Sequence, residues 1–477
     1  MVVQHNLRAM NANRMLGITT GVLSKSSEKL SSGYKINRAA DDAAGLAISE
    51  KMRKQMRGLT QASSNAEDGI SAVQTAEGAL TEVHDMLQRM NELAVKAANG
   101  TNALSDRQTI QDEVDQLLTE IDRVAETTKF NEIYLLKGDA NRVEKYLQAK
   151  DAGIDGQLQD GATTATFTMN ALKFGDSISI GGKQYQIGET KKDGGITKLQ
   201  DMIKNPASVA AGELITIDGV QYTVASDATT ENADKNILTA ENIAKKVVEQ
   251  SSVLYKGKTY HVMKDEKNTD GSAAANGDGV DDVDASVITA AKAYSMIRQE
   301  LALANSIGAK TGGNAVVEDV DTADPEKAIF AITQKGKYDV QEALNFNLHV
   351  GADADMTNKI GVTIDALDTR GLGINGLNVK DSTGAYATYA IDSIAEAIAH
   401  VSKQRSMIGA IQNRLEHTIN NLDNVVENTT AAESQIRDTD MATEMVKYSN
   451  ANILQQAGQS MLAQSNQANQ GVLSLLQ

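Results

Sequence analysis

Helix-breaking residues are distributed very unevenly along this chain of 477 residues. Its two prolines are Pro206 and Pro325, so residues 1–205 and 326–477 contain none. Because proline removes a backbone donor and interrupts a helix, its absence permits long helices at both ends. The middle is rich in Gly, Thr and Asp and reads as strands and turns. This pattern predicts helical ends that pair, with a different segment projecting between them, a layout more typical of an assembly subunit than of an enzyme.

The composition supports thin helical bundles. The chain has no Trp and no Cys, and only 4% of its residues are aromatic. A core of Leu, Ile, Val, Ala and Met suits closely packed helices. The lack of Cys excludes disulfides and thiol catalysis. The net charge is −17, and residues 137–399 alone carry −12, which argues against nucleic-acid binding.

The N-terminal region predicts three helices. In the first, Leu16, Leu23 and Leu30 recur every seven residues, and Ser31-Ser32-Gly33 provides a stop. A second helix is expected from Asp41-Asp42 to about Ala98, because carboxylates favour a helix N-terminus. Its apolar stripe consists of Leu80, Val83, Leu87, Met90, Ala94 and Ala97.

A third helix is expected after Asn99-Gly100. Ser105 with Gln108 forms a capping-box pattern at its start. One face would then carry Ile110, Val114, Leu117, Ile121 and Val124.

The C-terminal region mirrors these patterns. Alternating three- and four-residue steps run from Ile408 to Ile436, and Arg437-Asp438-Thr439-Asp440 forms a polar joint. In a last helix Leu454, Met461, Ala468 and Leu475 recur every seven residues. Heptads at both ends predict coiled-coil pairing. Periodicity alone allows a soluble bundle without assembly equally well.

The middle contains a weak repeat of hairpin-like segments. They are Ile178–Ile187, Ile215–Val224 and Tyr255–Val262, each with alternating apolar residues around a glycine turn. Helices are expected after the first two, near 199–203 and 240–248, which predicts small hairpin-plus-helix modules. A further hairpin is expected within 360–379. The repeated tyrosines could bind glycans, although hairpin core is the more common role for such residues.

Other functional classes find little support. There is no apolar run of 18 residues and no continuous apolar stretch in residues 1–20, so we expect neither membrane insertion nor a standard signal peptide. None of the six histidines is followed by Glu, so the zinc-protease motif is absent. A calcium loop beginning at Glu266 would lack its twelfth-position Glu, because Gly277 stands there. We therefore expect no enzyme activity, no metal and no cofactor.

Both ends of the sequence resemble bacterial flagellin. At the N-terminal end the matching motifs are Leu30-Ser-Ser-Gly-Tyr-Lys-Ile-Asn37, Asp41-Asp-Ala-Ala-Gly-Leu-Ala-Ile48, Gly58-Leu-Thr-Gln-Ala-Ser63, Asn65-Ala-Glu-Asp-Gly-Ile70 and Gln74-Thr-Ala-Glu-Gly-Ala-Leu80. At the C-terminal end they are Ala410-Ile-Gln-Asn-Arg-Leu415, Ala451-Asn-Ile-Leu-Gln-Gln-Ala-Gly458, Met461-Leu-Ala-Gln-Ser-Asn466 and Val472-Leu-Ser-Leu-Leu-Gln477. The resemblance covers roughly 1–140 and 360–477, and the middle, about 141–359, falls where the family has a variable outer region.

The resemblance implies a mainly α fold with inserted α+β domains. Residues 1–41 and 437–477 would form an inner coiled-coil domain of the D0 type. Residues 42–140 and 360–436 would form an outer-wall helical bundle of the D1 type with a β-hairpin, and residues 141–359 would form variable, surface-exposed D2/D3-like domains. In the inner domain the assembly residues would be Leu16, Leu23, Leu30, Leu454, Met461 and Leu475.

The implied function is that of a structural subunit that self-assembles into the bacterial flagellar filament for swimming. The resemblance implies secretion without a cleaved signal peptide, in unfolded form, through the type III export apparatus. Its partners would be further copies of itself, an export chaperone, and hook-associated and cap proteins. Narrow apolar stripes bury poorly in isolated helices, so we expect residues 1–40 and 437–477 to order only on subunit addition.

Flagellins are also ligands of Toll-like receptor 5. By resemblance the receptor-binding residues here are Gln88, Arg89, Leu93 and Glu113, with Arg89 as the anchor. The alternative is that these residues only hold neighbouring subunits together. For the whole chain, the alternatives are a hook–filament junction protein and a secreted surface adhesin.

Overall fold

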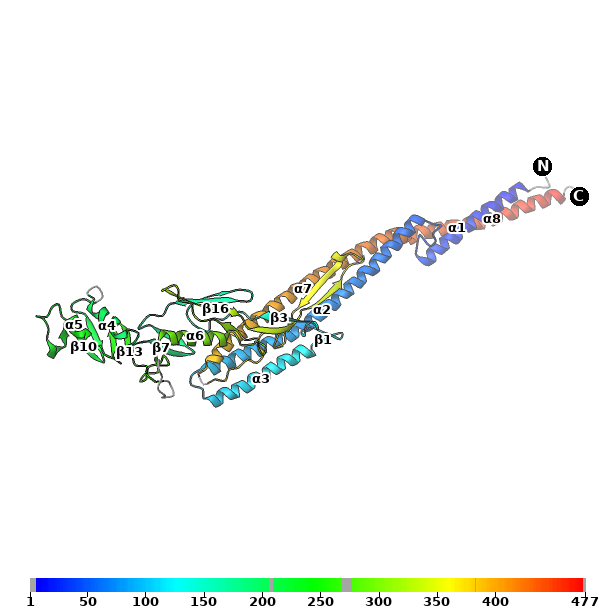
Figure 1. Cartoon of the computed structure of the whole chain (residues 1–477). Coiled ribbons are helices and arrows are strands. Elements are labelled where there is room, and N and C mark those ends of the chain that lie inside the picture. The colour runs from blue at the N-terminus through cyan, green and yellow to red at the C-terminus, as the bar shows by residue number, and fades with distance from the viewer. Residues whose placement is uncertain (1–5, 206–208, 268–276, 382, 475–477) are drawn as a thin grey trace. The chain divides into compact units, whose positions relative to one another are not determined.

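Five long helices form the two ends of the chain. The computed structural model describes residues 6–205, 209–267, 277–381 and 383–474. The N-terminal helices are α1 (Leu7–Ser32), α2 (Ala43–Ala98) and α3 (Leu104–Thr127), and the C-terminal helices are α7 (Ala385–Arg437) and α8 (Met441–Ser474) (Figure 1). Strands and short helices fill the segment between them. The fold is therefore mainly α with an inserted α+β part, which confirms the predicted class.

The ends of the N-terminal helices follow from local chemistry. α1 stops at Gly33, which adopts a left-handed conformation with φ 76°. α2 begins directly after Asp42, whose carboxylate accepts a hydrogen bond from the Gly45 amide at 2.9 Å. Both boundaries were predicted.

The prediction for the start of α3 was wrong. The helix begins at Leu104, so Ser105 lies inside it, and the carboxylate of Asp106 accepts a hydrogen bond from the Ala103 amide at 3.2 Å. The buried face also differs in part, because Leu118 and Ala125 are buried where Leu117 and Val124 are only partly buried.

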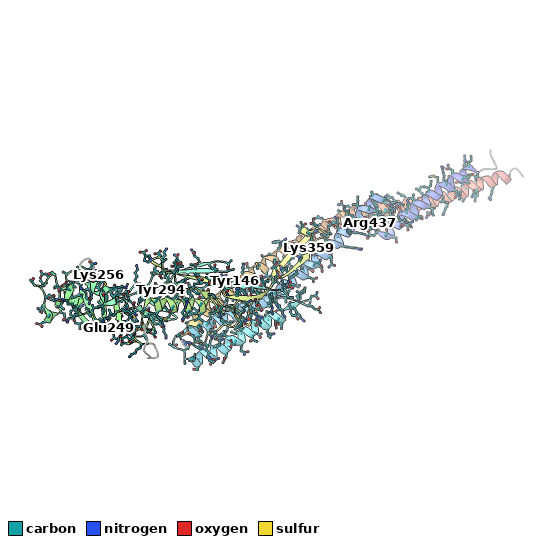
Figure 2. The ribbon with its side chains drawn as sticks, viewed as in Figure 1. Tyr146, Glu249, Lys256, Tyr294, Lys359 and Arg437 are labelled. Atoms are coloured by element: carbon teal, nitrogen blue, oxygen red, sulfur yellow. The ribbon has the colours of Figure 1, made fainter. Side chains whose placement is uncertain are left out.

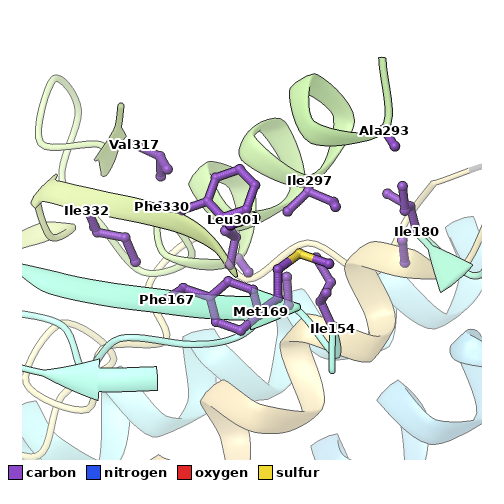
Figure 3. Packing of buried hydrophobic residues seen from close by; sticks show 14 of the residues in the cluster. Ile154, Phe167, Met169, Ile180, Ala293, Ile297, Leu301, Val317, Phe330 and Ile332 are labelled. Carbon is purple, nitrogen blue, oxygen red and sulfur yellow. The ribbon is translucent and has the colours of Figure 1, made fainter. Parts of the chain in front are cut away.

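The first part of the insert is built around a sandwich of strands and one helix. A four-stranded sheet has the order β15-β16-β5-β4 and packs with α6 (Ala290–Ala304). Figure 3 shows Phe167 and Phe330 facing Ile297 and Leu301 of α6. The strands are β4 (Gln157–Asp160), β5 (Ala165–Asn170), β15 (Val316–Val317) and β16 (Lys327–Gln334). The smaller sheet β14-β7-β6 contributes Ile180, Ile187 and Ile288 to the same core, from β6 (Ser177–Ile180), β7 (Lys183–Ile187) and β14 (Val287–Ile288).

A second core lies under a six-stranded sheet of order β11-β10-β9-β12-β13-β8. Its strands are β8 (Glu189–Thr190), β9 (Leu214–Ile217), β10 (Val220–Val224), β11 (Ile237–Leu238), β12 (Ser252–Tyr255) and β13 (Lys258–Met263). The helices α4 (Gly195–Lys204) and α5 (Ala240–Ala244) supply Leu199, Ile203 and Ile243 to this core, and a 3₁₀ turn, η1, spans Ala233–Lys235. The three predicted hairpins are confirmed as β6–β7, β9–β10 and β12–β13.

The remaining strands form short ribbons. They are the pairs β1 (Lys129–Phe130) with β2 (Ile133–Tyr134), β3 (Arg142–Tyr146) with β17 (Lys337–Gln341), and β18 (Leu344–His349) with β19 (Lys359–Ile364), and a 3₁₀ turn, η2, spans Met356–Asn358. The expected hairpin within 360–379 is wrong, because the partner of β19 precedes it in sequence. Residues 365–379 form no strand.

The chain divides into two compact units. One contains Met1–Val73, Phe346–Val362 and Gly409–Gln477, and the other contains Gln74–Asn345 and Thr363–Ile408. Both α2 and α7 contribute residues to each unit. Among the described residues, no helix is long and apolar enough to cross a membrane.

Candidate functional site

The helices α1 and α8 pack side by side along faces made mostly of small and polar residues (Figure 1). The buried and partly buried positions of both helices follow alternating three- and four-residue steps. On α1 they are Ala9, Ala12, Leu16, Thr19, Leu23, Ser26 and Leu30, and on α8 they are Glu444, Tyr448, Ala451, Gln455, Gly458, Leu462 and Ser465. Small residues let helix axes approach closely; a side chain at Gly458 would begin 3.4 Å from Leu16 Cδ1.

Polar contacts join the pair near both ends. Ser26 donates a hydrogen bond to Glu444 Oε1 at 2.7 Å, and this bond lowers the pKa of the Glu444 carboxyl. Near the other end, Asn6 Nδ2 donates to the Ser465 carbonyl oxygen at 3.4 Å. These contacts fix which face of α8 meets α1 but bury little apolar area.

The large apolar side chains of both helices lie on their outer surfaces. On α1, Leu7, Met10, Met15, Ile18 and Val22 are each 47–69% exposed. On α8, Met441, Met445, Val446, Ile453, Leu454 and Met461 are each 49–64% exposed. Monomeric proteins rarely expose so many neighbouring large apolar groups, and such patches mark interaction surfaces.

The predicted assembly residues therefore fall into two groups, one partly buried on α1 and one exposed on α8. Leu16, Leu23 and Leu30 are partly buried and belong to the α1 stripe that faces α8. Leu454 and Met461 are each 60% exposed and do not belong to the stripe of α8 that faces α1, so their role in assembly stays a prediction. Leu475 lies outside the described residues.

A second candidate site lies where α3 runs beside α2. Arg89 of α2 donates through Nε and Nη2 to Glu113 Oε1 of α3, at 3.0 and 2.8 Å. Arg89 also donates to Glu92 at 3.1 Å, and these bonds raise the pKa of its guanidinium. The side chains of Arg89 and Glu113 are 52% and 45% exposed. Gln88 is exposed and lies 2.8 Å from the His84 ring. The structure thus joins Arg89 and Glu113 at an accessible surface, and Gln88, which precedes Arg89 on α2, is also exposed.

Leu93 does not belong to that surface. It is only 3% exposed, and it lies beside the predicted stripe of α2, in which Leu80, Val83, Leu87, Met90, Ala94 and Ala97 are all fully buried. Direct contact between Leu93 and a partner is therefore inconsistent with its position, and the residue instead supports the packing of α2 beneath Arg89.

Two other predicted features are the repeated tyrosines and the possible metal ligands. Tyr185 packs against the core of the first module, and Tyr222 and Tyr260 pack against that of the second, so the repeated tyrosines are hairpin core. In the described part of the chain, no group of three His, Asp or Glu side chains is placed to hold a metal. Most of the calcium-loop-like segment, residues 268–276, lies outside the described residues.

Comparison with known proteins agrees with the arrangement of the helical ends. Residues 3–141 match the family model of the bacterial flagellin N-terminal helical region, and residues 391–476 match that of the C-terminal helical region. The flagellin of Clostridium tyrobutyricum is 38% identical over 98% of this chain and all of its own length. The chain belongs to the bacterial flagellin family.

Other full-length relatives give the same result. A flagellin of Halalkalibacterium halodurans is 33% identical over the whole of both chains, and one of Salmonella choleraesuis is 33% identical over 98% of this chain and 99% of its own. Membership of the family makes the protein a structural subunit of the flagellar filament, outside the cell, and not an enzyme. Because relatives named flagellin match along the whole chain, the alternative of a hook–filament junction protein is not favoured.

Proposed function

We propose that subunits of this flagellin polymerise through the outer faces of α1 and α8. The observation that carries the proposal is the distribution of side chains, with four leucines among otherwise mainly small or polar residues on the seam and eleven large apolar residues exposed outside it. Complete burial of one such side chain contributes about 1.5–3 kcal/mol. Packing against neighbouring copies would therefore supply the stability that the isolated pair lacks.

This proposal can be tested by replacing one exposed valine in each of two places. Val22 on α1 is 47% exposed and Val143 on β3 is 42% exposed. On filament seeds, we expect Val22→Ser to raise the monomer concentration needed for elongation about tenfold, because ~1.4 kcal/mol of burial corresponds to a factor of ten. Val143→Ser should change it less than twofold. Equal effects of the two substitutions would contradict assembly through the terminal helices.

The weak internal seam also supports a link between folding and assembly. We propose that residues 1–40 and 437–477 gain most of their protection only when a subunit joins the filament, which hydrogen exchange on monomer and filament would measure. This would favour export before polymerisation.

The proposed partners in export and assembly are an export chaperone, the type III export apparatus, and the hook-associated and cap proteins. The proposed domains remain 1–41 with 437–477, 42–140 with 360–436, and 141–359.

We further propose that Toll-like receptor 5 recognises the monomer at Gln88, Arg89 and Glu113. All three side chains are accessible in the chain, and Arg89 and Glu113 form an ion pair. Arg89 is already paired with two carboxylates, Glu113 and Glu92, so a receptor would meet a preorganised guanidinium rather than a mobile one. Such a fixed, planar donor is favoured at interface hot spots. Leu93 would act indirectly, by holding α2 in place.

The receptor proposal has a matched control on α3. Arg123 is 60% exposed and pairs with Glu120, much as Arg89 pairs with Glu113. We expect Arg89→Ala to weaken binding of monomer to purified receptor at least tenfold, by about 1.4 kcal/mol or more, as is typical of a hot-spot arginine. Arg123→Ala should leave the affinity within twofold. If Arg89→Ala bound as tightly as the unaltered chain, the surface would serve contacts between subunits only.

A further inference from the structure

Two connecting segments cross where the terminal helices meet the longer ones. Residues 33–42 link α1 to α2, and residues 438–440 link α7 to α8. The crossing is tied by a single antiparallel bridge between Tyr34 and Asp438. Lys35 donates its amide to the Arg437 carbonyl at 2.6 Å, and Thr439 donates to that of Gly33 at 2.9 Å. So few backbone bonds would by themselves form a hinge.

The side chain of Tyr34 adds contacts that restrain this connection. The Arg53 guanidinium, from the third turn of α2, lies 5.7 Å from the centre of the Tyr34 ring. That of Arg437, the last residue of α7, lies 5.0 Å from the same centre (Figure 2 marks Arg437). Cations within about 6 Å of an aromatic face are attracted by its quadrupole. One ring from the connecting segment therefore contacts cations from both long helices.

Each arginine is also held by a carboxylate from the opposite helix. Arg53 Nε donates to Glu433 Oε1 of α7 at 3.0 Å, and Arg437 Nη1 donates to Glu50 Oε1 of α2 at 2.8 Å. The side chains of Glu433 and Arg437 are only 11% and 13% exposed. Arg437 Nε is buried and makes no hydrogen bond among the described residues, so this guanidinium depends on the ring and on Glu50. Each guanidinium is thus held by a carboxylate from the opposite helix as well as by the Tyr34 ring.

We propose that Tyr34 is a positioning residue for the filament. Through its contacts with Arg53 and Arg437, it fixes the direction in which α1 and α8 leave α2 and α7, and thereby sets the twist between successive copies. The inference rests on polymerisation through α1 and α8 and adds the residue that orients this pair.

The test compares full-length variants grown on filament seeds. Tyr34→Leu keeps an apolar side chain but removes the aromatic face, whereas Tyr34→Phe keeps it. We expect Tyr34→Leu filaments to differ from the unaltered filament in helical twist or waveform by electron microscopy, and Tyr34→Phe filaments to match it. In the filament, Tyr34→Leu should raise hydrogen exchange of residues 33–42 and 437–440 about tenfold. Glu50→Gln, which loosens Arg437 without touching the ring, should shift both readouts in the same direction.

The controls separate a positioning role from general stability. Tyr146→Leu removes a tyrosine that also has a lysine, Lys337, over its ring at 5.5 Å, and it should change neither twist nor exchange at the crossing. Unchanged twist and exchange in Tyr34→Leu would overturn the proposal, as would a lower melting temperature with unchanged twist. If Tyr34→Leu formed no filaments, the twist of Glu50→Gln filaments would decide, and an unchanged twist there would overturn the proposal. Unchanged elongation by Val22→Ser would instead refute polymerisation through α1 and α8, whatever the result for Tyr34.

Discussion

At the scale of single residues, the glycines inside α2 differ in whether the neighbouring structure leaves room for a side chain. An alanine in place of Gly69 would put its Cβ 2.2 Å from Leu348 Cδ1, a side chain that packs into the small core formed with Ala66, Val350 and Leu415. The glycine therefore lets β18 approach the helix. Gly78, nine residues further along, has no atom within 4 Å of such a Cβ. Nothing within the described chain requires glycine at that position.

This difference predicts opposite effects of the same substitution. Gly78→Ala should raise the stability of the monomer by about 1 kcal/mol, because glycine is that much less favourable than alanine inside a helix. Gly69→Ala gains the same helix term but must displace Leu348, and overpacking costs about 1–3 kcal/mol, so we expect a net loss of ~1 kcal/mol. Thermal unfolding followed by circular dichroism measures both. A stabilised Gly69→Ala variant would show that β18 does not depend on this close approach.

At the scale of elements, periodicity predicted the long helices well because each buries a continuous stripe. The stripe from Leu80 to Ala97 in α2 is buried as expected. On α8 the most apolar heptad and the buried stripe differ. Leu454 and Met461 belong to the most apolar heptad in the sequence. The face of α8 that packs against α1 is instead lined by small residues such as Ala451 and Gly458. Which stripe faces a neighbouring copy cannot be read from one chain's hydrophobicity.

The contact that closes the C-terminal end of α2 was also invisible in the sequence. Arg107, in the first turn of α3, is 2% exposed and donates to the carbonyl oxygens of Ala97 and Asn99, at 2.9 and 3.2 Å, and of Asp381, at 2.9 Å. These acceptors come from the end of α2 and from the segment before α7. An arginine near a helix start has the pattern of a surface residue, and only the tertiary structure shows that it joins three segments.

We expect Arg107→Ala to lower the free energy of unfolding by about 2–3 kcal/mol, because one buried and two partly buried hydrogen bonds to carbonyl oxygens are lost. Arg107→Lys should recover only part of this loss, since one ammonium group cannot span all three acceptors. Arg123→Ala, which breaks an exposed ion pair, should cost less than ~1 kcal/mol. Urea unfolding monitored by the circular dichroism of the helices would rank the stabilities of the three variants. Equal midpoints for Arg107→Ala and Arg123→Ala would contradict a capping role.

At the scale of the whole molecule, the insert enters and leaves at one point. β3 and β17 pair in register, with Arg142 opposite Gln341 and Tyr146 opposite Lys337. The sequence predicted the hairpin repeats inside the insert, because each is local, but it could not predict a pairing between strands almost 200 residues apart. This ribbon brings the ends of the insert together, so residues 147–336 can be removed without breaking the ribbon itself. The apolar surfaces proposed for assembly lie on α1 and α8, outside it.

Removal of residues 147–336 should therefore leave assembly intact. Tyr146 and Lys337 can be joined by Asn-Gly, which favours the tight turn of a two-residue hairpin. We expect a less stable monomer, because Tyr389 loses its hydrogen bond to Glu300 and its apolar cover, and Ser393 loses its contact with Lys150. The concentration needed to elongate seeds should nevertheless stay within about threefold of the unaltered chain, since that would correspond to less than ~0.7 kcal/mol at the assembly surface. A shortened chain that folds, by circular dichroism, yet fails to elongate seeds would show that the insert contributes directly to polymerisation.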